Sequence, residues 1–263
     1  FKQILKLSSR KSPLPGAMLM AHHPPDRRKR SDVYMEEILS VQDLKRVYGR
    51  GTAATQALGG VSLSVEQGEF VGIMGPSGSG KTTTILGTNE RLRDKAGLRC
   101  AVIEGDIASD VDAITMKEAG MPAIQINTGG LCHLEGNMIM EAVDAFDQAV
   151  GLQNIDVIFI ENVGNLVCPV DFDLGEHLSI MILSVPEGDD KPIKYPGIFQ
   201  HAGAQLLNKV DVAPAFDFDM DRYTKTLDDL NPQAPRFAVS ARKGEGMDAW
   251  CDWLIGQIEQ ARA

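Results

Sequence analysis

Short apolar runs alternate with longer amphipathic segments along most of the chain. The runs at 68–74, 99–104, 122–126, 155–160, 178–184, 205–208 and 236–240 are rich in Ile, Val, Leu and Ala and have the length of buried strands. The segments at 82–95, 135–150 and 246–261, and one ending near Gly120, have the spacing of amphipathic helices. Alternation of this kind predicts an α/β fold, with a mostly parallel sheet, helices on both faces and a site at the strand ends.

The first 67 residues have a different character. Residues 1–35 are rich in Pro, Ser and Arg without apolar periodicity, which predicts a disordered basic tail. Residues 36–67 contain two predicted strands, at 38–44 and 61–65, and are expected to form a short β segment. We therefore place a single P-loop domain at 68–263.

Charge is divided unevenly between the tail and the body. Residues 1–31 carry eight basic side chains and one acidic one, a net charge of +7, so the chain total of −10 leaves −17 for the rest. An acidic body argues against nucleic-acid binding. No apolar run approaches the ~20 residues of a membrane span, and the first residues lack the apolar core of a secretion signal. We expect a cytoplasmic protein.

A glycine-rich loop follows the first buried run. Gly75-Pro-Ser-Gly-Ser-Gly80-Lys81-Thr82 matches the P-loop pattern GxxxxGK[ST] at every fixed position, between a predicted strand and a predicted helix. Its backbone N–H groups and the helix N-terminus would hold a polyphosphate, with Lys81 on the β- and γ-phosphates. The sheet is thus predicted to be that of a P-loop NTPase. The candidate phosphate-binding residues are Gly75, Ser77, Gly78, Ser79, Gly80, Lys81, Thr82 and Thr83.

A second motif predicts which base is bound. Asn208-Lys-Val-Asp211 lies at the end of an apolar run and matches the NKxD pattern, whose Asp accepts hydrogen bonds from guanine N1–H and the 2-amino group. Adenine lacks this pair of donors, so the Asp211 carboxylate would select GTP over ATP. The backbone of Ser240-Ala241 is the expected partner of guanine O6. Asn208, Lys209, Asp211, Ser240 and Ala241 are the base-binding candidates; a plain surface turn at 208–211 is the alternative.

Acidic residues end two other predicted strands. Mg²⁺ prefers hard oxygen ligands, so Asp106 and Glu161 are the candidates to hold it with the Thr82 hydroxyl. Glu161 begins Glu161-Asn-Val-Gly164, where many GTPases have the Asp of DxxG. We assign Lys81, Asp106 and Glu161 to catalysis. No arginine finger is evident, so slow intrinsic hydrolysis is expected.

The four cysteines fall into two groups. Cys132-His133 and Cys168 lie in loops after predicted strands, and two thiolates with an imidazole suit Zn²⁺ or Ni²⁺. Three ligands leave the shell incomplete, so a second subunit could complete it; simple burial is the alternative. Cys100 lies within a predicted strand and Cys251 between two tryptophans, which predicts packing roles.

From about Thr83 onward, the chain resembles the hydrogenase nickel-incorporation GTPases of the HypB type, in the family that also contains signal-recognition and urease-accessory GTPases. The stretches that carry the resemblance are Ala101–Asp106, Pro122–Gly129, Cys132–Leu134, Phe159–Pro169, Phe172–Glu176, Asp190–Pro192, Asn208–Asp211 and Ser240–Met247. The resemblance implies a GTPase that uses GTP and Mg²⁺ and forms a homodimer when GTP is bound. It also implies nickel or zinc on Cys132, His133 and Cys168 near the dimer interface, and nickel-delivery and hydrogenase-maturation proteins as partners. The N-terminal cysteine cluster of some members is absent.

Residues 36–81 instead resemble the opening of an ABC-transporter ATPase, in which Tyr48 would stack on adenine. No LSGGQ signature and no Walker B Asp-Glu pair follow. The expected function is therefore a GTP-hydrolysing nickel metallochaperone for [NiFe]-hydrogenase. The alternatives are an ATP-binding transporter subunit and a nucleotide-binding scaffold without turnover.

Overall fold

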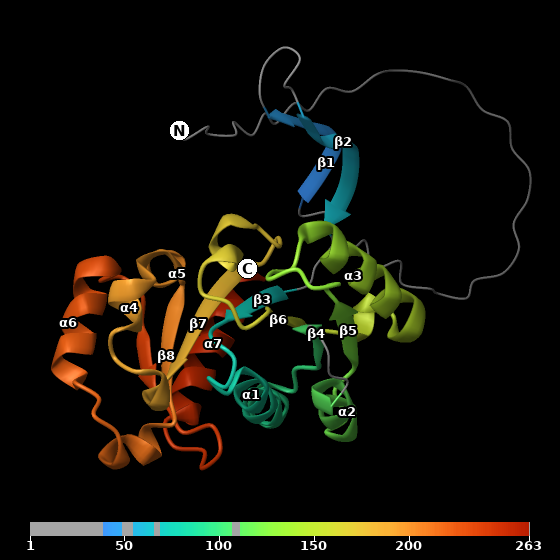
Figure 1. Cartoon of the computed structure of the whole chain (residues 1–263). Coiled ribbons are helices and arrows are strands. Elements are labelled where there is room, and N and C mark those ends of the chain that lie inside the picture. The colour runs from blue at the N-terminus through green and yellow to red at the C-terminus, as the bar shows by residue number, and fades with distance from the viewer. Residues whose placement is uncertain (1–38, 49–54, 66–68, 107–110, 263) are drawn as a thin grey trace, which may run out of the picture. The chain divides into compact units, whose positions relative to one another are not determined.

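The computed structural model describes residues 39–48, 55–65, 69–106 and 111–262 (Figure 1). The predicted tail at 1–35 lies outside the described residues. Strands β1 (Leu39–Tyr48) and β2 (Thr55–Val65) pair antiparallel in a two-stranded sheet of their own, with Leu39 opposite Val65 and Tyr48 opposite Thr55. Both strands are longer than the sequence predicted.

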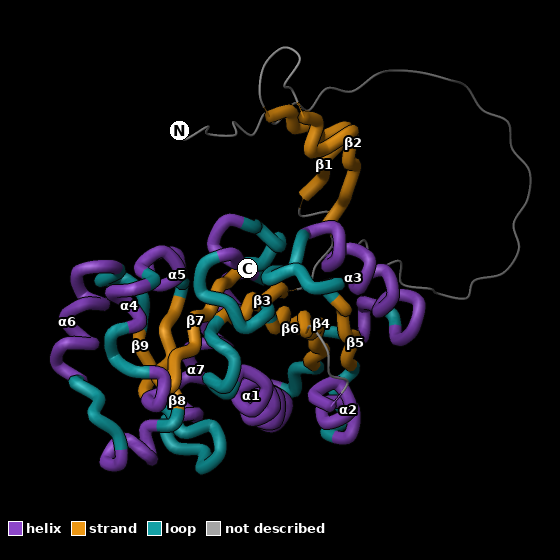
Figure 2. The backbone as a smooth tube through the Cα atoms, in the orientation of Figure 1, coloured by secondary structure: helices purple, strands orange, loops and turns teal. Residues whose placement is uncertain are grey.

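The main sheet has seven strands in the order β5-β4-β6-β3-β7-β8-β9, and every neighbouring pair is parallel (Figure 2). This arrangement confirms the predicted α/β class, in which buried apolar runs form parallel strands joined by helical crossovers. The strands are β3 (Glu69–Met74), β4 (Cys100–Asp106), β5 (Ala123–Asn127), β6 (Val157–Glu161), β7 (Leu178–Ser184), β8 (Ala204–Asn208) and β9 (Arg236–Ala238).

Helices follow the strands along the chain. The α-helices are α1 (Lys81–Ala96), α2 (Val111–Glu118), α3 (Gly136–Val150), α4 (Lys191–Lys194), α5 (Pro196–His201), α6 (Met220–Leu230) and α7 (Met247–Ala261). Short 3-10 turns are η2 (Leu152–Asn154), η3 (Cys168–Asp171), η4 (Val185–Glu187) and η5 (Val210–Ala215). Among the residues that the structure describes, no helix combines the length and apolar character needed to span a membrane.

Alternation along the strands divides the core between the two faces of the sheet. On one face, Ile85 of α1 and Trp250 of α7 pack in a cluster with Val102 and Phe159. The other face carries two clusters: one is built around α3 and one around α5 and α6, where Phe199 and Leu227 are fully buried. Helices therefore cover both faces, as predicted.

Because all seven strands are parallel, their carboxyl ends lie along one edge of the sheet. The glycine-rich loop 75–80 follows β3, and Glu161 and Asn208 are the last residues of β6 and β8. The segment with Cys132 and His133 follows β5. This edge brings together the candidate residues from distant parts of the chain.

Candidate functional site

The glycine-rich loop turns directly into α1. Gly80 is the N-cap of that helix with φ 89°, a left-handed conformation that glycine adopts without strain. The side chain of Lys81 is buried, and its Nζ donates to the carbonyl oxygens of Gly75 at 3.2 Å and Pro76 at 3.4 Å. The ammonium group therefore lies over the loop, where a lysine of a phosphate-binding loop belongs.

Asn208 joins the glycine-rich loop to the two predicted base-binding segments. Its Nδ2 donates to the carbonyl of Ser79 at 2.9 Å. Its Oδ1 accepts from the backbone N–H of Lys209 at 2.8 Å and of Ala241 at 3.1 Å. The side chain is buried at 2% exposure, so one carboxamide holds three loops in a fixed arrangement without competition from water.

Lys209 makes a second link between these loops. Its backbone is left-handed, with φ 60°, and its Nζ donates to the carbonyl oxygen of Gly78 at 2.7 Å. Since a non-glycine residue with positive φ is uncommon, this conformation indicates that the surrounding loops fix the backbone here. The residues from 75 to 80 and from 208 to 211 thus contact each other.

The Asp211 carboxylate lies beside the Ser240 loop. A hydrogen bond with Ser240, together with Lys243, whose Nζ lies 3.3 Å from Asp211 Oδ2, holds the pKa of this carboxyl below its usual value. Ser240 is buried, and its N–H donates to the carbonyl of Glu245 at 2.9 Å. Asp211 is therefore ionised at neutral pH, the state in which a carboxylate can accept two hydrogen bonds from a base.

The residues proposed for magnesium are placed in part. Thr82 Oγ1 donates to both carboxylate oxygens of Glu161, at 3.1 and 3.0 Å, and Lys81 Nζ lies 4.0 Å from Glu161 Oε1. Asp106 is the last residue of β4, next to β6 in the sheet, but its side chain lies outside the described part of the structure. The Thr82 hydroxyl and the Glu161 carboxylate offer the hard oxygen donors that Mg²⁺ prefers.

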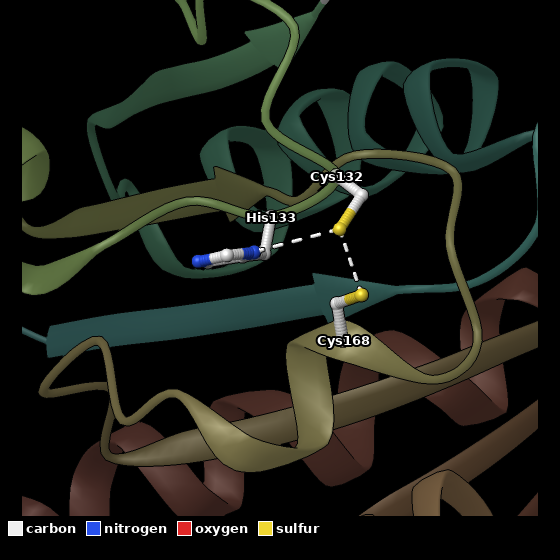
Figure 3. Close-up of side chains that lie close together, drawn as sticks. All are labelled: Cys132, His133 and Cys168. Atoms are coloured by element: carbon white, nitrogen blue, oxygen red, sulfur yellow. Dashed lines mark hydrogen bonds between the residues drawn. The ribbon is translucent and has the colours of Figure 1, made fainter.

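Cys132, His133 and Cys168 converge from two loops, although 36 residues separate the thiols (Figure 3). The sulfur atoms of Cys132 and Cys168 lie 2.7 Å apart, and Cys132 Sγ lies 3.7 Å from His133 Nδ1. One donor atom from each residue lies within 4.8 Å of the others, and both cysteines are free thiols. Hydrogen bonding to Cys132, followed by desolvation, raises the pKa of the Cys168 thiol.

Two further residues shape the surroundings of His133. The ring of Phe172 stacks on the imidazole, with centroids 3.6 Å apart and planes 16° from parallel. His133 Nε2 lies 3.6 Å from Glu135 Oε1, on the other side of the ring from the nitrogen nearest the thiols. Sequence reasoning assigned no role to Phe172, because an aromatic 39 residues away gives no spacing signal. Two sulfurs and an imidazole fit a borderline-soft ion such as Zn²⁺ or Ni²⁺ and leave coordination positions open.

Cys100 and Cys251 are buried in the core, as predicted. Desolvation is the main cause that raises the pKa of the Cys100 thiol to about 12 and of the Cys251 thiol to about 11. Thiols in this state are poor ligands and poor nucleophiles.

The sheet, the glycine-rich loop and the strand-end residues define a P-loop nucleotide-binding α/β protein. A family model described as CobW/HypB/UreG, nucleotide-binding domain, matches residues 69–238, and the chain belongs to this family.

Among curated proteins, the chain is 47% identical over 180 residues to hydrogenase maturation factor HypB of Escherichia coli K12, covering 68% of this chain and 60% of that protein. It is 35% identical over 232 residues to the hydrogenase/urease maturation factor HypB of Helicobacter pylori 26695, covering 88% and 90%. The chain thus spans about three-fifths of the E. coli relative and nine-tenths of the H. pylori one.

Two solved structures of such relatives share the fold. The crystal structure of HypB from H. pylori in complex with nickel is 35% identical with a TM-score of 0.70, covering 74% of this chain and 89% of that one. HypB from Archaeoglobus fulgidus is 37% identical with a TM-score of 0.66, covering 73% and 91%. The parallel sheet described above is therefore a fold that these relatives share.

Proposed function

We propose that this protein is a GTP-hydrolysing metallochaperone that assists nickel insertion into [NiFe]-hydrogenase. The observation that carries the proposal is the convergence of Cys132, His133 and Cys168 at the edge of the sheet that also holds the glycine-rich loop. Nickel is the cargo in this proposal, with zinc as the other candidate ion. The H. pylori relative of known structure was crystallised with nickel, which supports this choice.

The nucleotide chemistry follows from the residues at that edge. Lys81 would stabilise the charge that develops on the transferred phosphoryl group, and Thr82, Asp106 and Glu161 would hold Mg²⁺. Asn208 would hold the base-binding segments in position beside the glycine-rich loop, and the Asp211 carboxylate would accept hydrogen bonds from guanine. Replacing Lys81 by Ala should weaken triphosphate binding and abolish hydrolysis.

The proposal extends to assembly and organisation. A GTP-bound homodimer would let two copies share a metal whose shell three ligands do not fill. Nickel-delivery and hydrogenase-maturation proteins in the cytoplasm would be the partners. We keep the division into a basic tail at 1–35, a β segment at 36–67 and a P-loop GTPase domain at 68–263.

Nucleotide preference is the first test, measured as the affinities for GDP and ADP in the presence of Mg²⁺. We expect GDP to bind at least about tenfold more tightly, because losing one charge-assisted hydrogen bond costs about 1.5–3 kcal/mol. Asp211→Asn should remove the preference and gain affinity for xanthosine diphosphate, whose C2 carbonyl accepts where guanine donates. Asp217→Asn, an exposed carboxylate six residues further on, is the matched control.

Equal affinities for GDP and ADP in the wild type would contradict the guanine assignment and favour an ATP-binding transporter subunit. Selective GDP binding without any GTP hydrolysis would favour a nucleotide-binding scaffold. For the metal, a Cys132→Ala, Cys168→Ala double variant that still binds one nickel per subunit would exclude the proposed site.

A further inference from the structure

Asn162 lies between the proposed magnesium carboxylate and the proposed metal loop. It follows Glu161 directly, and its backbone N–H donates to the carbonyl of Ile73 in β3 at 3.0 Å. Its Oδ1 accepts from the backbone N–H of Leu134 at 3.2 Å and of Val163 at 2.9 Å. Leu134 immediately follows His133, so this carboxamide connects the end of β6 to the loop that carries two metal ligands.

The chain after Asn162 passes against the glycine-rich loop. A Cβ added to Gly164 would lie 2.7 Å from the backbone nitrogen of Ser77 and 2.9 Å from its Cα, so only glycine fits there. Further along, Asn165 Oδ1 accepts from the N–H groups of Val167 at 2.7 Å and Cys168 at 3.2 Å. Residues 161–168, here called the bridging segment, thus contact the glycine-rich loop and hold the backbone of Cys168, the third proposed metal ligand.

We propose that Asn162 is a positioning residue that transmits the nucleotide state to the metal site. Its side chain is 2% exposed, and a buried carboxamide with these partners moves together with them because the interior is densely packed. A change at Glu161 on exchange of GDP for GTP would therefore reach Leu134, and with it His133, through one hydrogen bond. This inference rests on the proposed function, and Asn162 itself is not a ligand.

A purely structural role predicts a different result. If Asn162 only stabilised the fold, its replacement would lower stability and metal affinity equally in both nucleotide states. A transmitting role predicts that the ratio of the two metal affinities changes. This ratio is the quantity to measure, because by linkage it also equals the effect of metal on nucleotide affinity.

The experiment is a nickel titration of the full chain with GDP and with a non-hydrolysable GTP analogue, followed by sulfur-to-nickel charge-transfer absorption. We expect the wild-type dissociation constants to differ by a factor in the range of about 5–150 between the two states. Asn162→Ala should bring this ratio to within about twofold of one. Asn162→Asp, which keeps an oxygen acceptor for both N–H groups, should retain most of it.

Asn127→Ala is the matched control. Asn127 is the last residue of β5, where the loop that carries Cys132 begins. Its exposed side chain accepts from Gly129 N–H at 2.9 Å, the one side-chain hydrogen bond it makes within the part of the chain that the structure describes. Its replacement should leave the ratio unchanged. Should Asn162→Ala fail to fold, hydrogen exchange of the Leu134 amide in metal-free wild type is the second measurement. That exchange should differ between the GDP and GTP-analogue states, whereas exchange at Gly129 should not.

The possible outcomes distinguish a failure of this inference from a failure of the proposed function. A coupled wild type whose Asn162→Ala variant keeps the full ratio overturns this inference and leaves the proposed function standing. A wild-type ratio of one overturns the nucleotide linkage itself and this inference with it. Identical Leu134 exchange in the two nucleotide states also overturns the role of Asn162.

Discussion

Replacing Asn208 by Ala removes a side chain that makes hydrogen bonds to three loops of the nucleotide site. Each of its three hydrogen bonds contributes about 0.5–1.5 kcal/mol, so the sum could reach about 4.5 kcal/mol. Ser79 is fully buried, so its carbonyl would lose a partner without gaining water. The Lys209 and Ala241 residues are half-buried, and their N–H groups can reach solvent once released. We therefore expect a loss of about 2–3 kcal/mol in the free energy of unfolding.

Urea unfolding followed by the fluorescence of Trp250 and Trp253 measures this loss, because both indoles pack in or against the main core cluster. In a domain of this size, the same change lowers Tm by about 4–12 °C. Affinity for GDP should fall as well, since the side chain that connects the glycine-rich loop to the proposed base-binding segments is lost. Asn127→Ala is the control, as an exposed carboxamide at another strand end. If Asn208→Ala costs no more than Asn127→Ala, Asn208 does not hold the loops together.

Three other results are expected. Gly164→Ala should push the bridging segment off the phosphate loop and weaken GTP binding in a binding assay; unchanged affinity would mean that the close approach is not needed. Iodoacetamide followed by mass spectrometry should label Cys132 and Cys168, which are partly exposed, and spare Cys100 and Cys251, which are buried and whose pKa values are raised mainly by desolvation. Labelling of either core thiol in the folded protein would contradict their assignment. The pKa of the Asp211 carboxyl lies below the usual aspartate value of about 3.9, so this group stays charged throughout the neutral range. The preference for GDP over ADP should therefore be constant from about pH 5 to 8, and a decline near pH 6 would refute this.

The long helices could be read from the sequence because apolar spacing and glycine boundaries agree. The predicted segments at 82–95, 135–150 and 246–261 differ by one residue at most from each bound of α1, α3 and α7. Gly80 and Gly246 stand at the N-caps with positive φ, and Gly97 and Gly151 follow the C-terminal ends of α1 and α3. Local propensity and burial thus favour the same bounds.

The helices between β7 and β9 were not predicted, although the strand at 205–208 was. Helix α6 was missed although the sequence carries its signal, because Met220, Tyr223, Leu227 and Leu230 recur at helical spacing among polar residues. Its N-cap is Asp219, whose side chain accepts from the N–H of Arg222 at 2.9 Å. Helices α4 and α5 have four and six residues, too short for a periodic signal.

The candidate site likewise has parts that adjacent residues form within one loop, which could be predicted, and contacts between distant loops, which could not. Motifs such as 75–82 and 208–211 are local, because their chemistry needs adjacent residues in one loop. The stacking of Phe172 on His133 and the bond from Leu134 to Asn162 depend on how distant loops meet. No spacing rule encodes such contacts, so they emerge only from the assembled sheet.

Strand order explains how the loop that carries Cys132 and His133 reaches the end of β6, where Glu161 lies. The loop after β5 must cross β4 to reach the end of β6, because β4 lies between these two strands. It crosses at Gly105, where an added Cβ would lie 2.7 Å from Leu134 Cγ, so the absence of a side chain in β4 lets Leu134 pack against the sheet. That contact brings the Leu134 N–H within reach of Asn162. It also places His133 at the same edge of the sheet as Cys168. The glycine in β4 therefore lets the loop that carries His133 approach the bridging segment closely.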